Sequence, residues 1–326
     1  MKIYLVTGGC GFIGSYVVGE LLKDENNFIY VIDKMGIGSS PDNIIGGHLG
    51  GHPRVNYIFR DIAAADIAAV LPSVRADYVI HLAAESHVDR SIEDSSPFVQ
   101  SNVAGTVNIL NYVKDVGARM VHVSTDEVYG HLDLTSPPFR ESDPLQPRSP
   151  YAASKAASDL FVQSYFKTYH TDVSITRCCN NYGPRQHDEK LIPTIIRAII
   201  SGKKIPIYGN GMNIREWIHA KDHAAAIIEV LYMDDPGTVF NIPGSKHLTN
   251  IDITRNIIGI VENQLPSTKR EGGDYIEFVV DRAGHDFRYA VATQYDLESV
   301  KYQQEFCLED TVAHYIKKYS ELKQIL

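Results

Sequence analysis

Two carboxyl groups stand next to each other at Asp126 and Glu127, directly after the apolar run MVHVS at 120–124. Neighbouring side chains of a strand point to opposite faces, so both acids reach one site only if the strand ends there and the chain turns. Taken alone, the pair is typical of a surface turn with two solvated acids. Buried together, adjacent carboxyl groups would take different pKa values, and one could then act as an acid and the other as a base.

Tyr151 and Lys155 form a second pair that could do chemistry. They lie four residues apart in YAASK and share a face if this segment is helical. A free tyrosine has a pKa near ~10, which the neighbouring ammonium would lower, as would a positively charged cofactor bound beside it. Such a tyrosine could take the proton of a hydroxyl group while a hydride leaves for the cofactor. Pairs with this spacing also occur by chance on helices, so the interpretation depends on a nucleotide site nearby.

The segment TGGCGFIGS at 7–15 indicates such a site. It matches G-x-G-x-x-G and lies between an apolar run and a helical stretch, where glycines allow a tight turn and a pyrophosphate can rest at the helix N-terminus. Asp33 lies 19 residues after Gly14. A carboxylate there can bind a ribose 2′-hydroxyl and would repel a 2′-phosphate, which favours NAD over NADP even with Lys34 beside it.

Other predicted strand ends point into the same crevice. The segment RDI could present Asp61 and Ile62 to an adenine, and the small side chains of Ala83 and Ala84 would let a cofactor approach closely. The predicted cofactor contacts are Gly8, Gly11, Phe12, Ile13, Gly14, Asp33, Lys34, Asp61, Ile62, Leu82, Ala83, Ala84, Ser101, Tyr151 and Lys155.

The elements that position these residues alternate along the first half of the chain. Continuous apolar runs separated by helical stretches are typical of a parallel sheet covered on both faces. We therefore predict an α/β fold, a Rossmann-type doubly wound parallel sheet with a smaller C-terminal α/β substrate lobe. The expected NAD-binding domain is 1–180, with a return of about 214–240, and the substrate lobe is 181–326. The predicted strands are 3–7, 28–33, 55–59, 77–84, 120–124 and 173–177, and the predicted helices include 97–116, 151–169 and 191–201. A further helix is expected to carry His219 and His223 within the segment 217–231.

The amino-acid composition excludes several classes of binding partner. The formal net charge of −9 gives a surface that repels phosphate backbones, so nucleic acid is not an expected partner. The four cysteines lack zinc-ligand spacing and fit a reducing compartment. The apolar run at the N-terminus is too short for a signal peptide or a membrane span. We expect a soluble cytoplasmic protein that contacts no membrane and binds no metal.

Seven motifs carry a resemblance to a known family, in the order TGGCGFIG, AAESHVDRS, STDEVYG, YAASK, RCCNNYGPRQ, EKLIP and DRAGHDFRYA. From residue 3 to about 290, the chain resembles the nucleotide-sugar 4,6-dehydratases of the extended short-chain dehydrogenase/reductase superfamily. The glycines and the Tyr-x-x-x-Lys spacing mark only the superfamily. The Asp126–Glu127 pair and the GHDFRYA stretch are more specific to the dehydratases.

The resemblance implies a lyase that converts dTDP-glucose or UDP-glucose to its 4-keto-6-deoxy form with NAD as cofactor. Oxidation at C4 makes the C5 hydrogen acidic, Glu127 then acts as the base at C5, Asp126 protonates the departing C6 hydroxyl, and the hydride returns to C6. Thr125, Tyr151 and Lys155 complete the implied catalytic set. Two arginines would bind the diphosphate of the substrate. The implied substrate contacts are Ser86, Thr125, Asn180, Lys190, Arg215, Asn250, Arg282 and His285.

Several alternatives stay open. A preference for thymidine or uridine depends on one methyl group. An epimerase or a UDP-glucuronate decarboxylase would use the same scaffold but would not need the adjacent acids. A catalytically silent nucleotide-binding regulator would be expected to have lost one of the catalytic residues, and all are present. Apolar residues near 97–116 and 151–169 predict a homodimer, with packing inside one subunit as the alternative. Rhamnose is one destination of a 4-keto-6-deoxy sugar.

Overall fold

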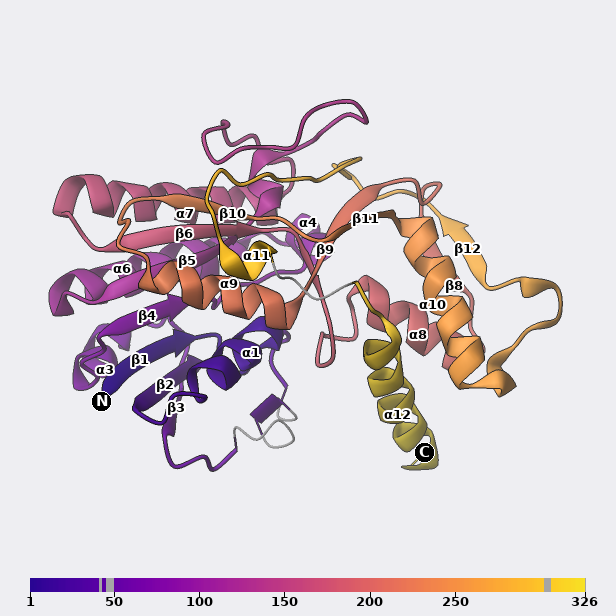
Figure 1. Ribbon diagram of the computed structural model, residues 1–326, viewed down its shortest axis with the longest axis horizontal. Coiled ribbons are helices and arrows are strands. Elements are labelled where there is room, and N and C mark those ends of the chain that lie inside the picture. Colours follow the sequence, from indigo (N-terminus) through magenta and orange to yellow (C-terminus); the bar gives the residue numbers. More distant parts are fainter. Residues whose placement is uncertain (41–42, 45–49, 302–305, 326) are drawn as a thin grey trace.

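A parallel sheet of seven strands forms the larger part of the molecule in the computed structural model, which describes residues 1–40, 43–44, 50–301 and 306–325 (Figure 1). Every neighbouring pair of its strands is parallel. From one edge to the other, the strands are β10 (Val239–Ile242), β6 (Val173–Cys178), β5 (Arg119–Thr125), β4 (Tyr78–His81), β1 (Lys2–Thr7), β2 (Asn27–Asp33) and β3 (Val55–Phe59). This order confirms the predicted Rossmann-type fold. It reverses direction between β1 and β4, where such sheets form a ligand crevice at the carboxyl ends of the strands.

Helices cover both faces of this sheet, which explains why its strands are apolar along their whole length. On one face, α1 (Phe12–Leu21) and α9 (Ala220–Tyr232) pack on Tyr4 and Val6 of β1. On the other face, α3 (Ile67–Val70), α6 (Gly105–Val116) and α7 (Pro150–Tyr169) pack on Leu5. All seven residues of β5 are buried, so the strand that precedes the acidic pair lies in the centre of the core.

The helix predicted at 97–116 consists of three consecutive pieces. They are α5 (Ser96–Phe98), the π-helix η2 (Val99–Ala104) and α6, and they follow the short helix α4 (Val88–Glu93). The helix predicted at 151–169 is confirmed as α7 and starts one residue earlier. Its N-terminus has a strong local signal, because Ser149 accepts a hydrogen bond from the backbone N–H of Ala152 and Pro150 occupies the first helical position.

A smaller part of the molecule lies beside the carboxyl ends of the large sheet, at the right in Figure 1. Its isoleucine-rich core lies between helices and two small sheets. One sheet contains β11 (Lys246–Thr249), β9 (Ile214–His219) and β7 (Asn180–Tyr182), and the other contains β12 (Ile276–Val279) and β8 (Ile205–Tyr208). Its helices are α8 (Leu191–Ile200), α10 (Asn250–Gln264) and α12 (Glu309–Ile325), and its short turns are η4 (Pro266–Thr268) and η5 (Glu271–Gly273). Three short elements belong to the larger part: η1 (Leu71–Ser73) follows α3, η3 (Asp126–Tyr129) follows β5, and α11 (Glu298–Lys301) packs on α9.

The helix expected to carry both His219 and His223 begins one residue after His219. Residues 217–219 belong to β9, which pairs with β11 and β7 and buries Trp217. Tertiary pairing therefore overrides the local helical pattern here. The helix begins at Ala220, where the His219 side chain accepts a hydrogen bond from the N–H of Lys221. The following α9 and β10 return to the seven-stranded sheet.

Candidate active site

The strand β5 ends at Thr125, and the chain turns there into η3. Thr125 caps this turn, since its Oγ1 accepts a hydrogen bond of 3.3 Å from the N–H of Glu127. The turn lets two neighbouring side chains face the same cavity, which a continuing strand would prevent. Asp126 is buried, with 2% of its surface exposed, and Glu127 is half-buried. The pair is thus not a solvated surface turn.

The two carboxyl groups experience different electrostatic environments. Burial raises the pKa of Asp126 well above its usual range, and the neighbouring Glu127 charge raises it further. Burial also raises the pKa of Glu127, but Arg282, Arg215 and Lys190 oppose that rise. Asp126 therefore holds a proton more readily than Glu127. This is the arrangement that an acid and a base at adjacent positions require.

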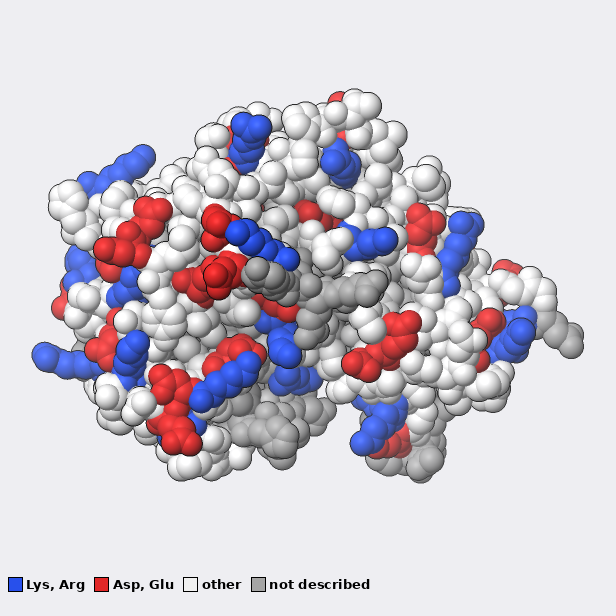
Figure 2. All heavy atoms as spheres, in the orientation of Figure 1, with Lys and Arg blue, Asp and Glu red and all other residues white. Residues whose placement is uncertain are grey.

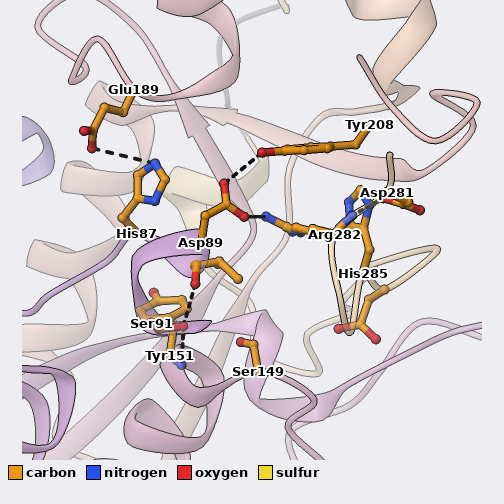
Figure 3. Close-up of polar contacts among 12 residues, drawn as sticks. His87, Asp89, Ser91, Ser149, Tyr151, Glu189, Tyr208, Asp281, Arg282 and His285 are labelled. Carbon is orange, nitrogen blue, oxygen red and sulfur yellow. Dashed lines mark hydrogen bonds and ion pairs between the residues drawn. The ribbon is translucent and has the colours of Figure 1, made fainter. Parts of the chain in front are cut away.

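Tyr151 occupies the first turn of α7, and its backbone N–H donates a hydrogen bond of 3.1 Å to Ser91 Oγ (Figure 3). Burial raises the pKa of its phenol, the Glu127 charge raises it further, and a hydrogen bond with Thr125 lowers it. The lowering that we predicted from Lys155 is not what dominates in the ligand-free protein. Lys155 Nζ instead donates to the carbonyl oxygen of Val123 at 2.9 Å. A phenolate at Tyr151 therefore needs the additional positive charge of a bound cofactor.

Lys155 sits on a buried polar cluster that no sequence motif indicated. Its Nζ lies 3.4 Å from His122 Nε2, which in turn lies 3.4 Å from Asp159 Oδ1. Asp159 Oδ2 accepts a hydrogen bond of 2.8 Å from Arg177 Nε. Burial lowers the pKa of Lys155 to about 8, and the charge of Asp159 opposes this lowering. Asp159 is therefore the buried counter-charge of Lys155.

The glycine-rich turn lies at the N-terminus of α1, as predicted. Gly8 has φ +70°, and a side chain there would meet the backbone of Ala83 at 2.8 Å, so the turn and the end of β4 approach closely. Gly11 precedes the helix and leaves its N-terminus without a side-chain cap. The first N–H groups of a helix have no partner within the helix, and here they border the cavity. These residues fit the pyrophosphate of a dinucleotide.

Asp33 and Lys34 have partners that the sequence did not indicate. Asp33 accepts hydrogen bonds from the N–H of Cys10 at 3.0 Å, the N–H of Met35 at 2.8 Å and Ser39 Oγ at 2.8 Å. Its carboxylate thus holds the surrounding loop in place while it lines the cavity. The Nζ atom of Lys34 contacts Ser101 Oγ at 2.9 Å and a carboxylate oxygen of Glu85 at 2.7 Å. These contacts tie the end of β2 to the π-helix η2 and to the loop after β4.

One continuous cavity brings together all the predicted cofactor and catalytic residues. It extends from the glycine-rich turn to the acidic pair, and four of the predicted substrate residues, Ser86, Thr125, Asn180 and Lys190, line it. Sequence reasoning missed other side chains in its wall, including those of Cys178, Asn181 and His223. These come from β6, β7 and α9. A short signal, RCCNNYG at a strand end, could have indicated the first two.

The other predicted substrate residues do not line this cavity. Arg282 Nη1 lies 3.7 Å from Asp89 Oδ1, and Tyr208 donates a hydrogen bond of 3.3 Å to the second oxygen of Asp89 (Figure 3). His285 Nδ1 lies 2.6 Å from Asp281 Oδ1 in the same view. The first residue of α10, Asn250, donates its backbone N–H to a loop carbonyl.

Positive charge gathers around Glu127 although the chain as a whole is acidic. Figure 2 shows basic and acidic side chains interspersed over one face of the molecule. By contrast, Arg215, Lys190 and Arg282 all act on the Glu127 carboxylate. Arg215 is buried, with its Nη1 and Nη2 atoms donating to backbone carbonyl oxygens. A phosphorylated ligand that enters from this side would meet three cations.

Comparison with known proteins decides which family this geometry represents. The model of the family described as GDP-mannose 4,6 dehydratase matches residues 5–315. The chain belongs to this family. Among curated relatives, it is 43% identical over 310 residues to the low-salt glycan biosynthesis protein Agl12 of Haloferax volcanii, with 94% of each chain covered. It is 38% identical over 335 residues to the dTDP-glucose 4,6-dehydratase of Haemophilus influenzae, with 98% of each covered.

The fold of this 4,6-dehydratase family member also matches a solved structure closely. The DesIV dTDP-glucose 4,6-dehydratase of Streptomyces venezuelae, solved with NAD and dTDP bound, superposes with a TM-score of 0.87 at 40% identity, and the match covers 98% of both chains. The resemblance to nucleotide-sugar 4,6-dehydratases that the motifs indicated is therefore confirmed. Within the described ranges, no helix is both long and apolar enough to cross a membrane.

Proposed function

We propose that this protein is an NAD-dependent dTDP-glucose 4,6-dehydratase, a hydro-lyase that forms the 4-keto-6-deoxy sugar nucleotide. The observation that carries the proposal is the pair of adjacent carboxyl groups on one turn, of which Asp126 holds its proton more strongly than Glu127. Both lie in the cavity that also holds Tyr151. The relatives of known name at about 40% identity support the same activity.

Each catalytic side chain has a task that its position supports. Tyr151 accepts the proton of the C4 hydroxyl as C4 is oxidised, and the charge of Lys155 favours the phenolate. Glu127 removes the C5 proton, which the C4 ketone has made acidic. Asp126 protonates the C6 hydroxyl, which leaves as water. Glu127 then returns its proton to C5.

The cofactor site fits NAD. The uncapped N-terminus of α1 would hold the pyrophosphate, and apolar Ile62 and Leu82 would flank the rings. Asp33 at the end of β2 favours a free ribose hydroxyl over a 2′-phosphate. When bound, NAD supplies a hydride acceptor for C4 and returns the hydride to C6. Arg282, Arg215 and Lys190 would bind the diphosphate of the substrate, and Asn250 and His285 would lie on its nucleoside side.

The alternatives explain less of the site. An epimerase or a decarboxylase would not need the acid at Asp126, whose burial costs free energy unless it holds a proton for a reaction. A silent nucleotide-binding protein would not need the charged cluster beneath Lys155. UDP-glucose remains the alternative substrate, because thymine and uracil differ by one methyl group, worth about 1–3 kcal/mol of discrimination.

We also propose a homodimer that acts in a reducing compartment such as the cytoplasm. Three large apolar side chains on η2 and α7 are exposed, Val99 at 51%, Leu160 at 58% and Phe161 at 41%. A second copy of the same helices could cover them. All four cysteines are free thiols. We further propose a division into two functional parts, an NAD-binding domain at 1–180 with a return of about 214–240, and a substrate lobe at 181–326. Rhamnose synthesis is one pathway that the product would serve.

The direct test is to incubate the purified protein with dTDP-glucose and, separately, with UDP-glucose, and to follow the sugar nucleotide by mass spectrometry. Loss of one water with no net change in NAD is the expected result. Comparison of the two initial rates gives the base preference. An isomer of unchanged mass would indicate an epimerase instead, and loss of carbon dioxide from UDP-glucuronate would indicate the decarboxylase.

A further inference from the structure

The loop between β7 and α8 carries part of the wall of the active-site cavity. Residues 183–190 form neither helix nor strand, and Gln186, His187 and Lys190 of this loop line the cavity. Arg185 has φ +73°, a conformation that a residue with a side chain keeps only when its surroundings hold it there. The position of the loop therefore depends on contacts with neighbouring elements.

One side of the loop is attached to the larger part of the molecule. Glu189 forms an ion pair with Arg90 of α4, and its second carboxylate oxygen lies 3.7 Å from Nε2 of His87, the residue before that helix (Figure 3). Lys190 Nζ donates a hydrogen bond of 2.7 Å to the carbonyl oxygen of Ser86. These contacts place the Lys190 ammonium beside the loop that follows β4.

The other side of the loop is attached to the C-terminal helix α12. Asp188 Oδ1 accepts hydrogen bonds from Tyr319 Oη at 2.8 Å and from Lys318 Nζ at 3.0 Å. Tyr315 Oη donates a hydrogen bond of 2.5 Å to the carbonyl oxygen of Gln186. Burial would raise the pKa of Asp188, but the hydrogen bonds from Lys318 and Tyr319 lower it below its usual value, so the carboxylate stays charged.

The three donors lie on one face of α12, because residues 315, 318 and 319 are spaced by three and four positions. Tyr315 and Tyr319 are 0% and 5% exposed in the isoleucine-rich core, where α12 packs on α8 and α10 (Figure 1). Phenylalanine would fill these places equally well, and a buried tyrosine hydroxyl needs a partner. Both hydroxyl groups find theirs in the loop that carries Lys190.

We propose that Asp188 is a positioning residue through which α12 holds Lys190 in place for the diphosphate of the sugar nucleotide, and this proposal rests on the proposed function. The two residues belong to one turn, in which the N–H of Lys190 donates a hydrogen bond of 3.0 Å to the carbonyl oxygen of His187. A shift of Asp188 therefore shifts the ammonium. None of the described residues of α12 lines the cavity, so the helix acts only through this loop.

The kinetic consequence follows from the part of the substrate that Lys190 would bind. The diphosphate does not react, so its contacts stabilise the bound substrate and the transition state alike. A displaced ammonium should therefore raise KM and leave kcat unchanged. A displacement of about 1 Å can cost up to about 10²-fold, and we expect about tenfold for a loop that keeps its contacts with α4.

The test removes the hydroxyl groups that hold the loop and keeps the packing. NAD-loaded Tyr315→Phe/Tyr319→Phe and Asp188→Ala should each show a KM for dTDP-glucose about tenfold higher, with kcat within about twofold of the unmodified protein. Tyr275→Phe is the matched control, because it removes a buried hydroxyl from the same core that bonds to Glu262. It should keep the unmodified KM. Melting curves and bound NAD establish folding, and Tyr319→Phe alone replaces the double variant if that variant is not folded.

A combination with Lys190→Met tests whether α12 acts through this lysine. Lys190→Met should itself raise KM, and addition of the two tyrosine changes to it should raise KM no further. A full additional rise would overturn the proposal, because α12 would then act on another part of the site. An unchanged KM in the double variant and in Asp188→Ala would overturn it as well. So would an equal rise in Tyr275→Phe, since loss of any core hydroxyl would then suffice.

A further measurement does not depend on turnover. In the ligand-free protein, the amides of residues 183–190 should exchange hydrogen about tenfold faster in Tyr315→Phe/Tyr319→Phe than in the unmodified protein or in Tyr275→Phe. Equal exchange in all three proteins would overturn the proposal, because α12 would then not hold the loop. Absence of dehydrated product from the unmodified protein would refute the proposed function instead, and the exchange rates distinguish these two failures.

Discussion

Replacement of Asp159 by asparagine should disable Lys155 in a pH-dependent way. Two successive contacts of 3.4 Å through His122 Nε2 put Lys155 Nζ within 6.8 Å of Asp159 Oδ1. At an effective dielectric constant of about 20, a charge pair at that distance is worth about 2.4 kcal/mol. Removal of the carboxylate should therefore bring the pKa of Lys155 from about 8 to about 6. The positive charge of Arg177, which stays buried and loses its carboxylate partner, acts in the same direction.

The protonation state of Lys155 decides at which pH the activity of Asp159→Asn is lost. Lys155 is charged below its pKa, so both proteins carry the ammonium at pH 5. At pH 7, its charged fraction should fall from about nine tenths to about one tenth in Asp159→Asn. We therefore expect kcat of Asp159→Asn relative to the unmodified enzyme to drop about tenfold at pH 7 and to recover toward pH 5. Breaking the buried ion pair should also destabilise the fold by about 3–5 kcal/mol, so melting curves must accompany the kinetics.

A matched control is available in the same molecule. Asp172 also pairs with an arginine, Arg119, but its side chain is half-exposed and belongs to the opposite end of the sheet. Asp172→Asn should leave the pH profile unchanged. If the activity ratio of Asp159→Asn to the unmodified enzyme were the same at pH 5 and pH 7, the carboxylate would act only through stability, and the electrostatic argument would be refuted.

Three further changes test other parts of the site. Tyr151→Phe should abolish C4 oxidation, and addition of substrate should then give no transient absorbance of reduced cofactor. Asp126→Asn should still oxidise C4 but eliminate water at least about 10²-fold more slowly. Full dehydration by either variant would contradict the assignment. The pKa of Asp126 is raised in the folded protein, so the folded state loses stability as the pH rises from the pKa of the unfolded chain through the pKa of the folded protein. Asp126→Asn removes this loss. It should therefore melt at a higher temperature than the unmodified protein at pH 8 and at the same temperature near pH 4. Gly14→Ala places a methyl group 2.8 Å from the Cα of Gly9, so NAD should no longer co-purify with the protein, while an alanine at Gly19, which has open space around it, should retain it.

Much of this site could be predicted because its signals are local. The glycine-rich turn, the strand ends and the Tyr-x-x-x-Lys spacing each lie within a few residues, and the parallel sheet brings their carboxyl ends to one edge. The acidic pair required one further step, the turn η3 after Thr125. The Ser149–Pro150 start of α7 is equally local. In these segments, local propensity and tertiary structure agree.

The rest depends on contacts between distant segments. His122 and Asp159 look like an ordinary strand histidine and an ordinary helix carboxylate, and only the packing of α7 on β5 makes them neighbours. Asp89 meets Arg282 although they are far apart in the chain. The strand β9 was not predicted, because its partners β11 and β7 are distant from it in the sequence. Contacts between segments that are distant in the sequence cannot be predicted from the residue pattern of any one segment.

Because the chain returns to the large sheet after residue 219, the protein cannot be split at one position into two pieces that each fold. After β7 and β9 have left for the smaller part, α9 and β10 come back, and Ala224, Ile227 and Val230 of α9 complete the core on top of α1. A gene fragment that ended near residue 180 would leave that apolar face bare and would lack an edge strand. A single recombination event near residue 180 therefore cannot replace the substrate lobe by that of a related protein. New sugar specificities on this scaffold are more accessible through changes in the loops between the returning elements.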